Sequence, residues 1–247
     1  MRRFFTEPEN IQGNIANITE DAMHITKVLR MQEGDIITLF DGTGYEYTAK
    51  LISIDKDVCT AEIISKSLSD LEPDTKVTIY QGIPKSGKME GIIQKSVELG
   101  VYAIVPVEMD RCVAKLDGGK KQLDKIKRWN KIAVEAAKQC GRGILPEVKE
   151  PVSFKTAIDQ MKLGGLPLMP YEVLASSDDS SIKNVLSKSI ENNISVIIGP
   201  EGGFSDSEAE YAKINGINLV GLGKRILRTE TVSSAVLAII MYEKNEM

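Results

Sequence analysis

The stretch SVIIGPEGGFS, residues 195–205, decides the fold class of this chain. Ser195–Ile198 is mostly apolar and β-branched, which predicts a buried strand, and Gly199-Pro200 ends the run. A helix is expected over Ser205–Asn215, because Ser205 is a good N-cap residue. A strand, a short loop and a helix form the repeating unit of α/β proteins. The stretch therefore predicts a parallel sheet, with a glycine-rich loop at the carboxyl end of one strand.

The same alternation continues on both sides of this stretch. Strands are expected at Val77–Tyr80, Ala103–Val107, Leu166–Met169 and Asn218–Gly221, and helices at Lys88–Leu99, Lys121–Gln139, Ser181–Ser189 and Thr229–Lys244. Ligands of such sheets bind beyond the carboxyl ends of the strands. The loops that follow the strands are therefore the places to search for function.

The first seventy residues have a different pattern. Ile36–Phe40, Tyr45–Ile54 and Val58–Ser65 alternate apolar and polar residues, which predicts antiparallel strands, and a short helix is expected over Asp21–Arg30. Short strands with tight turns indicate a small β-barrel. The polar stretch SLSDLEPD, residues 67–74, contains a proline and marks the expected boundary between a domain at 1–70 and a domain at 75–247.

Composition excludes several classes of protein. The 247 residues are 42% hydrophobic, and none of the apolar runs reaches the ~18 residues of a membrane helix. The N-terminus MRRFFTEPEN meets acid and proline too early for a secretory signal. One histidine and three scattered cysteines disfavour a catalytic triad, a metal site and a disulfide framework. We expect a cytoplasmic protein without a metal or a membrane partner.

Charge is unevenly distributed along the chain. The net charge is −4, yet residues 111–149 hold eleven Lys or Arg against four Asp or Glu, a local +7 beside −11 elsewhere. A basic face on an acidic body suits a polyanion that is bound at one site. A solvated helix face would have the same composition, so charge alone leaves both interpretations open.

One glycine-containing loop resembles a nucleotide-binding motif without matching it. GIPKSGKM, residues 82–89, approaches the phosphate-binding pattern GxxxxGK[ST], but Met89 replaces the metal-binding hydroxyl and Pro84 removes a backbone donor. We therefore favour phosphate or RNA contacts by Lys85 and Lys88 at a helix N-terminus over a nucleoside triphosphatase. A GxGxxG motif after a predicted strand, which a Rossmann dinucleotide site needs, is also missing from the sequence.

Two other loops carry stronger signals. IIGPEGGF, residues 197–204, places three glycines and Glu201 after a strand, where a ligand can approach the backbone closely. LGKRILRTET, residues 222–231, offers Arg225 and Arg228 for an anion and Glu230 in the first turn of a helix. A tight turn and a helix-capping salt bridge are the plain alternatives. Together the two loops look like one half of a binding cleft.

These two loops resemble the signature of the RsmE family. GPEGGFS at 199–205 and LGKRILRTET at 222–231 carry the resemblance, together with RRFF at 2–5, HITKVLRMQEGD at 24–35, LFDGTG at 39–44, QKSVELGV at 94–101, the Arg111 region and RWNKIAVEAAKQCGRGILP at 128–146. Members are S-adenosylmethionine-dependent methyltransferases of the knotted SPOUT superfamily, which act on N3 of a uridine in 16S ribosomal RNA. Cys140 and Val232 depart mildly from the family pattern.

The resemblance implies a PUA-like barrel, an α/β domain with a C-terminal trefoil knot, and a homodimer. It implies that S-adenosylmethionine is held mainly by backbone groups, with these candidate residues: Met169, Tyr171, Glu172, Ile198, Gly199, Gly202, Leu222, Gly223, Ile226 and Leu227. The expected partner is 16S ribosomal RNA in the small subunit, with these candidate contacts: Arg2, Arg3, Arg30, Lys85, Lys88, Arg111, Lys121, Lys125, Arg128, Gln139, Arg142 and Arg225.

Methyl transfer to N3 requires that the N3 proton leaves. Arg228 is expected to stabilise negative charge on the uracil oxygens, and Glu230 or Glu201 to orient groups or accept the proton. A carboxylate is a weak base unless burial raises its pKa, so the identity of the base stays open. A covalent mechanism through Cys140 is the competing chemistry. A non-catalytic RNA-binding or ribosome-assembly factor is the competing function.

Overall fold

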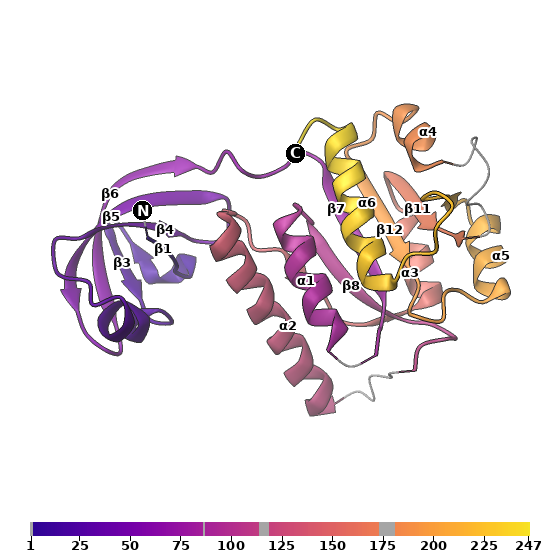
Figure 1. Cartoon of the computed structure of the whole chain (residues 1–247). Coiled ribbons are helices and arrows are strands. Elements are labelled where there is room, and N and C mark those ends of the chain that lie inside the picture. The colour runs from indigo at the N-terminus through magenta and orange to yellow at the C-terminus, as the bar shows by residue number, and fades with distance from the viewer. Residues whose placement is uncertain (1, 86, 114–118, 173–180) are drawn as a thin grey trace. The chain divides into compact units, whose positions relative to one another are not determined.

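The computed structural model describes residues 2–85, 87–113, 119–172 and 181–247, which form two compact units (Figure 1). The first unit comprises residues 1–72 and 137–145, and the second comprises residues 73–136 and 146–247. The sequence pattern does not predict that residues 137–145 return to the first unit. They do so through the turn around Gly42 and Gly44, since the Gly44 N–H donates to the Gly143 carbonyl.

The first unit is built on one sheet. Its strands are β1 (Arg3–Phe5), β2 (Ile11–Gln12), β3 (Ile15–Ile18), β4 (Ile36–Phe40), β5 (Tyr45–Ile54) and β6 (Cys59–Leu68). Their order is β1-β4-β5-β6-β3-β2, antiparallel except for the pair of β1 and β4. The strands predicted from alternation are confirmed as β4, β5 and β6. The first strands are too short to show alternation in the sequence, which is why the prediction missed them.

The helix expected over Asp21–Arg30 is wrong in length and in winding. Only His24–Val28 is helical, and it is a π-turn in which the Leu29 N–H bonds the His24 carbonyl. Arg30 ends the segment, because its φ of 50° lies in the left-handed region. Behind this turn the interior of the unit is apolar, and Ile18, Leu39 and Leu51 are fully buried.

The second unit has a parallel sheet. Its strands are β7 (Lys76–Gly82), β8 (Ala103–Glu108), β9 (Glu147–Val148), β10 (Val152–Ser153), β11 (Leu166–Pro170), β12 (Asn193–Ile198) and β13 (Asn218–Val220). The order is β10-β8-β7-β12-β11-β13, with β9 beside β8, and all these pairs are parallel. The predicted α/β alternation and parallel sheet are confirmed.

Helices flank this sheet. They are α1 (Lys88–Glu98), α2 (Gly119–Cys140), α3 (Phe154–Met161), α4 (Ile182–Ser187), α5 (Asp206–Ile214) and α6 (Thr229–Glu243). Helices α1 and α6 pack against each other (Figure 1), whereas α3 and α5 share a buried cluster with Tyr80, Val105 and Ile197 of the sheet. Helix α3 was not predicted from the sequence, although apolar residues recur in it at helical spacing and the Ser153 hydroxyl caps it.

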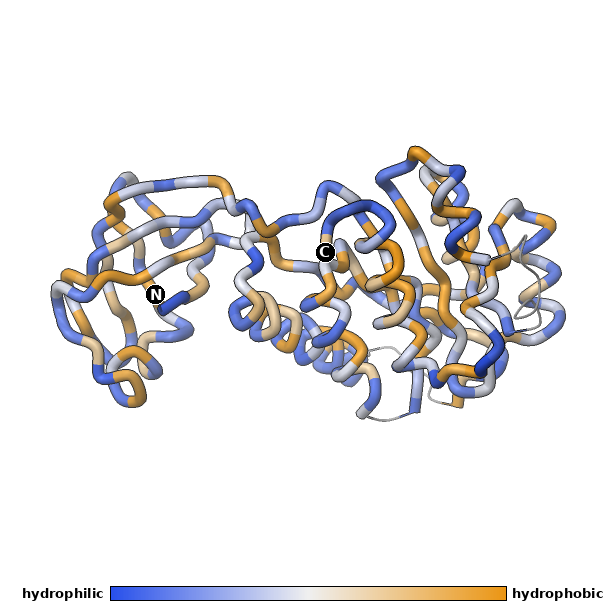
Figure 2. Tube along the Cα trace, turned by 45° about the horizontal axis from the view of Figure 1, so that its top comes forward, coloured by the Kyte–Doolittle hydropathy of each residue, from blue (hydrophilic) through white to orange (hydrophobic). Residues whose placement is uncertain are grey.

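Hydropathy follows this arrangement. Figure 2 shows hydrophobic (orange) stretches along the strands, and hydrophilic (blue) residues over much of α2. In the residues that the structure describes, no helix combines the length and the apolar character needed to cross a membrane. Because all the strands of the second sheet run in parallel, the loops that follow β7, β11, β12 and β13 lie at the same end of the sheet, beyond the carboxyl ends of the strands.

Candidate active site

Three loops meet at the carboxyl ends of β11, β12 and β13. They comprise residues 170–172, 199–204 and 222–228, and the first turn of α6 completes the group. Two cavities of about 310 and 380 Å³ open among them. Each volume falls in the range of small-molecule sites, roughly 300–1,000 Å³.

The two cavities share a wall, which consists of Pro170, Glu172, Ile226, Leu227 and Val232. The first cavity is completed by Tyr171 and by Leu222, Gly223, Lys224 and Arg225. The second is completed by Lys88, by Ile198 and the residues that follow it up to Phe204, and by Arg228 and Thr229. A ligand of two linked parts could occupy both cavities, since they are separated only by shared side chains.

Local backbone geometry explains the glycines of these loops. Gly223 has a φ of 99°, which residues with a side chain rarely adopt, and the space around it is open. Gly202 is different, because a Cβ there would lie 3.0 Å from the Cβ of Arg111. Gly202 therefore serves the close approach of Arg111, whose guanidinium donates to the Gly202 carbonyl at 3.0 Å.

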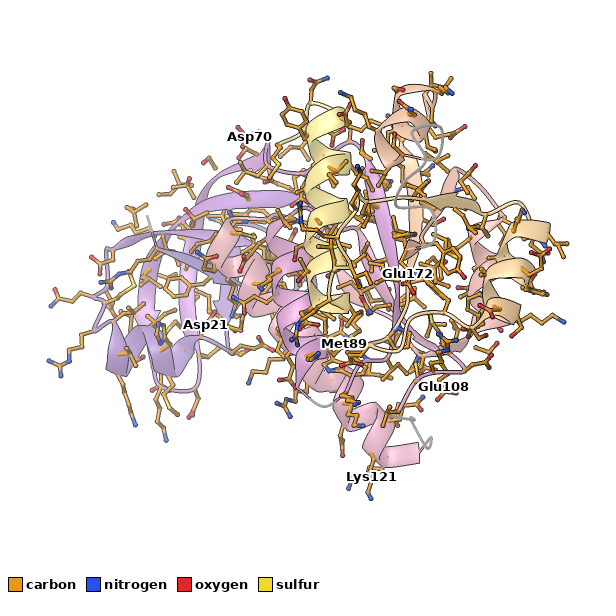
Figure 3. The ribbon with its side chains drawn as sticks, turned by 45° about the vertical axis from the view of Figure 1, so that its right-hand side comes forward. Asp21, Asp70, Met89, Glu108, Lys121 and Glu172 are labelled. Carbon is orange, nitrogen blue, oxygen red and sulfur yellow. The ribbon has the colours of Figure 1, made fainter. Side chains whose placement is uncertain are left out.

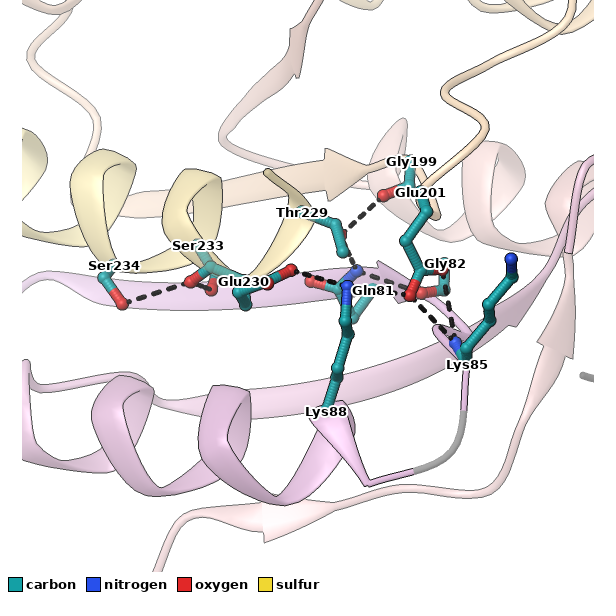
Figure 4. Close-up of polar contacts among 10 residues, drawn as sticks. All are labelled: Gln81, Gly82, Lys85, Lys88, Gly199, Glu201, Thr229, Glu230, Ser233 and Ser234. Atoms are coloured by element: carbon teal, nitrogen blue, oxygen red, sulfur yellow. Dashed lines mark hydrogen bonds and ion pairs between the residues drawn. The ribbon is translucent and has the colours of Figure 1, made fainter. Parts of the chain in front are cut away.

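A charged cluster lies beside the second cavity (Figure 4). The Lys88 ammonium stands 3.1 Å from a carboxylate oxygen of Glu201 and 3.3 Å from one of Glu230. The backbone N–H of Lys85 donates to both oxygens of Glu201, at 3.1 and 3.2 Å. Three segments that are far apart in the sequence thus meet at Lys88.

The cluster keeps its members charged. Hydrogen bonding to Glu201 is the main cause that raises the pKa of Lys88. Burial alone would raise the pKa of Glu201, but hydrogen bonds from backbone N–H groups and from Lys88 outweigh it and lower the pKa. The pKa of Glu230 is lowered mainly by its own backbone N–H and further by Lys88. Carboxylates with lowered pKa values are weak proton acceptors.

Arg228 lines the second cavity at the N-cap of α6, and it is exposed. In the part of the chain that the structure describes, Glu230 forms its ion pair with Lys88 and none with Arg228. The helix-capping salt bridge considered for these two residues is therefore absent from that part of the chain. The charge of Arg228 still helps to lower the pKa of Glu230, and its exposed guanidinium can meet an anionic ligand in the cavity.

Most residues assigned to the cofactor do come together. The first cavity is lined by Tyr171, Glu172, Leu222, Gly223, Ile226 and Leu227, and the second by Ile198, Gly199, Gly202 and again Glu172, Ile226 and Leu227. Among the described residues with this assignment, only Met169 lines neither cavity, because it is fully buried in the core. The next residue, Pro170, takes its place in both walls.

Several residues of these walls have no role in the prediction from sequence. They are Pro200, Thr229 and Val232. Thr229 and Val232 lie in or beside the quoted motif, and the spacing of α6 could have placed them on its inner face. Pro200 carries no signal in a single sequence, because a proline after a strand normally indicates only its end.

The residues assigned to RNA are distributed over both units. In the second unit Lys85, Arg111, Lys121, Lys125, Arg128 and Arg225 are exposed, and Lys88 belongs to the charged cluster. Figure 3 shows Lys121 projecting from the start of α2. Arg128 is ion-paired with Glu90 at 2.8 Å. In the first unit Arg2, Arg30 and Gln139 are exposed.

Two arginines of the first unit need a correction. Arg142 is 5% exposed and its guanidinium bonds the Glu72 carboxylate at 2.8 Å, so it has no surface to offer to RNA. Arg3 is half-buried, pairs with Glu46 at 2.7 Å and stacks over the Phe40 ring. Both arginines stabilise the fold of this unit, because a partly desolvated guanidinium is retained only with such partners.

Two alternative chemistries find no support in the described residues. Met89 has no hydroxyl to offer to a metal-bound nucleotide, and its side chain is buried in the core. Cys140 is half-buried with its thiol on the Ala137 carbonyl, and neither cavity wall includes it. A covalent adduct through Cys140 is therefore not supported.

Comparison with protein families gives two matches. Residues 71–241 match the family described as RNA methyltransferase domain, and residues 19–64 match the RNA methyltransferase PUA domain. The first match covers both cavities and the charged cluster. The second lies within the β-sheet unit.

Comparison with individual proteins agrees with these matches. Ribosomal RNA small subunit methyltransferase E of Bacillus subtilis (strain 168) is 37% identical over 249 residues, covering 98% of this chain and 97% of that protein. The protein of the same name from Buchnera aphidicola (subsp. Acyrthosiphon pisum) is 34% identical, with 87% and 82% covered. A crystal structure of ribosomal RNA small subunit methyltransferase E from Neisseria gonorrhoeae bound to S-adenosyl methionine is 33% identical, with a TM-score of 0.85 and 98% and 97% covered.

Proposed function

The chain belongs to the ribosomal RNA small subunit methyltransferase E family, and from this membership we propose that it transfers a methyl group from S-adenosylmethionine to N3 of a uridine in 16S ribosomal RNA. The observation that carries the proposal is the pair of adjoining cavities at the carboxyl ends of β11, β12 and β13, with Arg228 in one wall. Open α/β sheets bind their ligands beyond the carboxyl ends of their strands.

The cavities fit S-adenosylmethionine, which has a flat aromatic adenine and charged amino-acid groups. Leu222, Ile226 and Leu227 supply apolar surface for the adenine, and Glu172 lies in the wall common to both cavities and can accept from hydroxyl or ammonium groups. The open space around Gly223 lets a ligand reach the backbone. When bound, the sulfonium supplies an electrophilic methyl group.

The charged residues have different roles in the loss of the N3 proton. Arg228 stabilises the negative charge that develops on the uracil oxygens as N3 loses its proton. The lowered pKa values of Glu201 and Glu230 make them poor acceptors for that proton, and Lys88 keeps its own. We therefore assign the proton to water. The two carboxylates hold the Lys88 ammonium in place beside the cavity.

RNA binding extends beyond the cavities. We propose an RNA-binding domain at residues 1–70 and a methyltransferase domain at residues 75–247, with 16S ribosomal RNA in the small subunit as the substrate and the cytoplasm as the location. The exposed basic residues of α2, Lys121 and Lys125 among them, would contact phosphates. The buried Arg142 is left out of this set.

The family resemblance also leads us to propose the trefoil knot and the homodimer. Strand β13 lies at the edge of the sheet beside β11, whereas α6, which follows it, packs on α1 and α4. The segment between β13 and α6 must therefore pass back over the ends of neighbouring strands, which supports a threaded path. Sedimentation can test the homodimer, because it measures the mass of the protein in solution.

Calorimetric titration and nucleoside analysis test the function together. The protein should bind both S-adenosylmethionine and S-adenosylhomocysteine, and it should produce 3-methyluridine in unmodified small subunits or their RNA. Binding to neither cofactor form would favour the alternative of a non-catalytic RNA-binding factor. Cofactor binding with a different methylated nucleoside in the RNA would overturn the N3 assignment alone.

A further inference from the structure

A network of buried polar hydrogen bonds lies beside the charged cluster (Figure 4). Gln81 in β7 is 0% exposed, and its side-chain amide donates to the Gly82 carbonyl and to the Thr229 hydroxyl, both at 2.9 Å. Thr229 is 5% exposed, and its hydroxyl donates to the Gly199 carbonyl at 2.7 Å. These hydrogen bonds join β7 to the start of α6 and to the loop after β12.

The direction of each hydrogen bond in this network is determined. The Thr229 hydroxyl has a single proton, and a carbonyl can only accept, so that proton goes to Gly199. The hydroxyl oxygen must then accept from the Gln81 amide, whose second proton goes to Gly82. This arrangement fixes the amide of Gln81 in one orientation and leaves its Oε1 atom buried without a partner in the described part of the protein.

An unpaired buried acceptor lowers the stability of the fold. An apolar side chain of similar size at position 81 would avoid that cost. The glutamine is therefore better explained by what its amide connects than by stability.

The network connects the three segments that form the charged cluster. Gly82 ends β7 and precedes the loop that leads to Lys88, Gly199 precedes Glu201, and Thr229 precedes Glu230. The first two segments also touch directly, since a Cβ on Gly82 would lie 2.7 Å from the Pro200 ring. The hydrogen bonds of Gln81 and Thr229 thus fix the distances between the three segments that carry Lys88, Glu201 and Glu230.

We propose that Gln81 and Thr229 are positioning residues, which hold the 199–203 loop and the start of α6 in register for methyl transfer. This inference rests on the proposed function, because its catalytic consequence requires that reaction. Gln81 lines neither cavity, and Thr229 lines only the second one, so the apolar surface proposed for the adenine does not include them. Cofactor affinity should therefore change much less than the rate. Misplacement of reacting groups by about 1 Å can lower a rate about 10²-fold.

The test compares three substitutions of matched shape. Thr229→Val removes the hydroxyl and keeps the volume, Thr229→Ser keeps the hydroxyl, and Thr231→Val makes the first change on an exposed residue of the same helical turn. We expect Thr229→Val to lower the single-turnover rate about 10²-fold. Its Kd for S-adenosylmethionine should stay close to that of the unmodified protein. Thr229→Ser and Thr231→Val should retain both properties.

Hydrogen exchange supplies a readout that needs no RNA. Amides of residues 199, 201–203 and 228–232 should exchange faster in Thr229→Val than in Thr229→Ser, and Gln81→Met should give the same change in both segments. Equal exchange in the valine and serine variants, or equal single-turnover rates, would overturn the positioning role. A Kd raised by the same factor as the rate is lowered would make the residues part of cofactor binding instead. If the unmodified protein transfers no methyl group while the exchange pattern holds, the proposed function fails and the register argument stands.

Discussion

Replacing Arg228 with alanine gives the sharpest test of the chemistry proposed for this site. The substitution removes a guanidinium from the wall of the second cavity and keeps the backbone of the helix start. The Arg228 carbonyl accepts from the N–H groups of Thr231 and Val232, and alanine retains those bonds. A loss of activity in a folded Arg228→Ala variant would therefore report on the side chain.

The expected loss follows from the surroundings of the guanidinium. Removing one preorganised donor to a developing anion lowers a rate about 10²–10³-fold. The higher figure belongs to sites that exclude water, whereas Arg228 is exposed in the protein without RNA. We therefore expect a single-turnover rate about 10²-fold lower, or about 2.7 kcal/mol in the barrier. The Kd of S-adenosylmethionine should hardly change, because a charge that develops on the uracil is absent when the cofactor binds alone.

The pH dependence separates this role from simple RNA attraction. A higher pH populates the uracil anion without help from the protein, so the rate of Arg228→Ala should rise more steeply with pH than the rate of the unmodified protein. Arg228→Lys keeps the charge and should lose less activity. Lys213→Ala, an exposed change on α5, serves as the control for net charge. The reasoning is refuted if Arg228→Ala has a normal single-turnover rate, or a slow rate that rises with pH no more steeply than normal.

Four further changes test other parts of the molecule. Lys88→Met should raise the pKa of both neighbouring glutamates, because Lys88 favours their charged forms; an NMR titration of the two carboxyl groups checks this, and unchanged pKa values would contradict the cluster. Gly223→Val should weaken cofactor binding in a folded protein, since it forces a side chain at a φ of 99° into open cavity space; calorimetry with unchanged affinity would refute this. Lys121→Gln with Lys125→Gln should reduce the slope of log affinity for RNA against log salt by about 0.7–0.9 for each phosphate that the variant no longer binds, and an unchanged slope would mean that this face is only solvated. Arg142→Ala should cost about 3 kcal/mol and lower the melting temperature by roughly 6–12 °C, because it leaves the half-buried Glu72 carboxylate without its cation; calorimetric scanning with an unchanged melting temperature would contradict the stabilising role of this ion pair.

The charged cluster also has a pH range of its own. The pKa values of Glu201 and Glu230 lie below the ordinary 4.5, so their contribution to stability is present above that pH and disappears as the pH falls through the folded values. The pKa of Lys88 lies above the ordinary 10.5, so its contribution is present below that pH and disappears as the pH rises through the folded value. The cluster is intact at any pH where the reaction would be assayed.

Periodicity predicted the long elements and missed the short ones. Strands such as β5 and β12 have enough residues to show alternation or a continuous apolar run, and they bury it. β9 and β10 have two residues each, and so no period exists to detect. The π-turn at His24–Val28 looks like the start of an ordinary helix in sequence, because its side chains have the same composition.

The site was predicted as far as single loops and no further. The loops at 199–204 and 222–228 carry glycines and charges that a single sequence reveals. The ion pairs of Lys88 with Glu201 and Glu230 could not be predicted, since they depend on which strands are neighbours. The burial of Arg142 could not be predicted either. An arginine in a basic segment gives the same sequence pattern whether it is exposed to water or paired with Glu72.

The strand order itself explains why a loop at residues 82–88 contributes to a site formed mainly by residues 170–230. β7 lies between β8 and β12, so the first strand of this unit pairs with a strand that occurs more than a hundred residues later. Both strands run in the same direction, and the loop after β7 therefore lies at the same end of the sheet as the loop after β12. Helix α6 returns from the edge strand β13 to pack on α1, which follows that first loop. Any chain that pairs these strands in parallel and brings α6 back onto α1 must carry residues 222–228 across the ends of β11 and β12. The cavities lie on that path, and this is why the start of α1 belongs to the site as much as the glycine loops do.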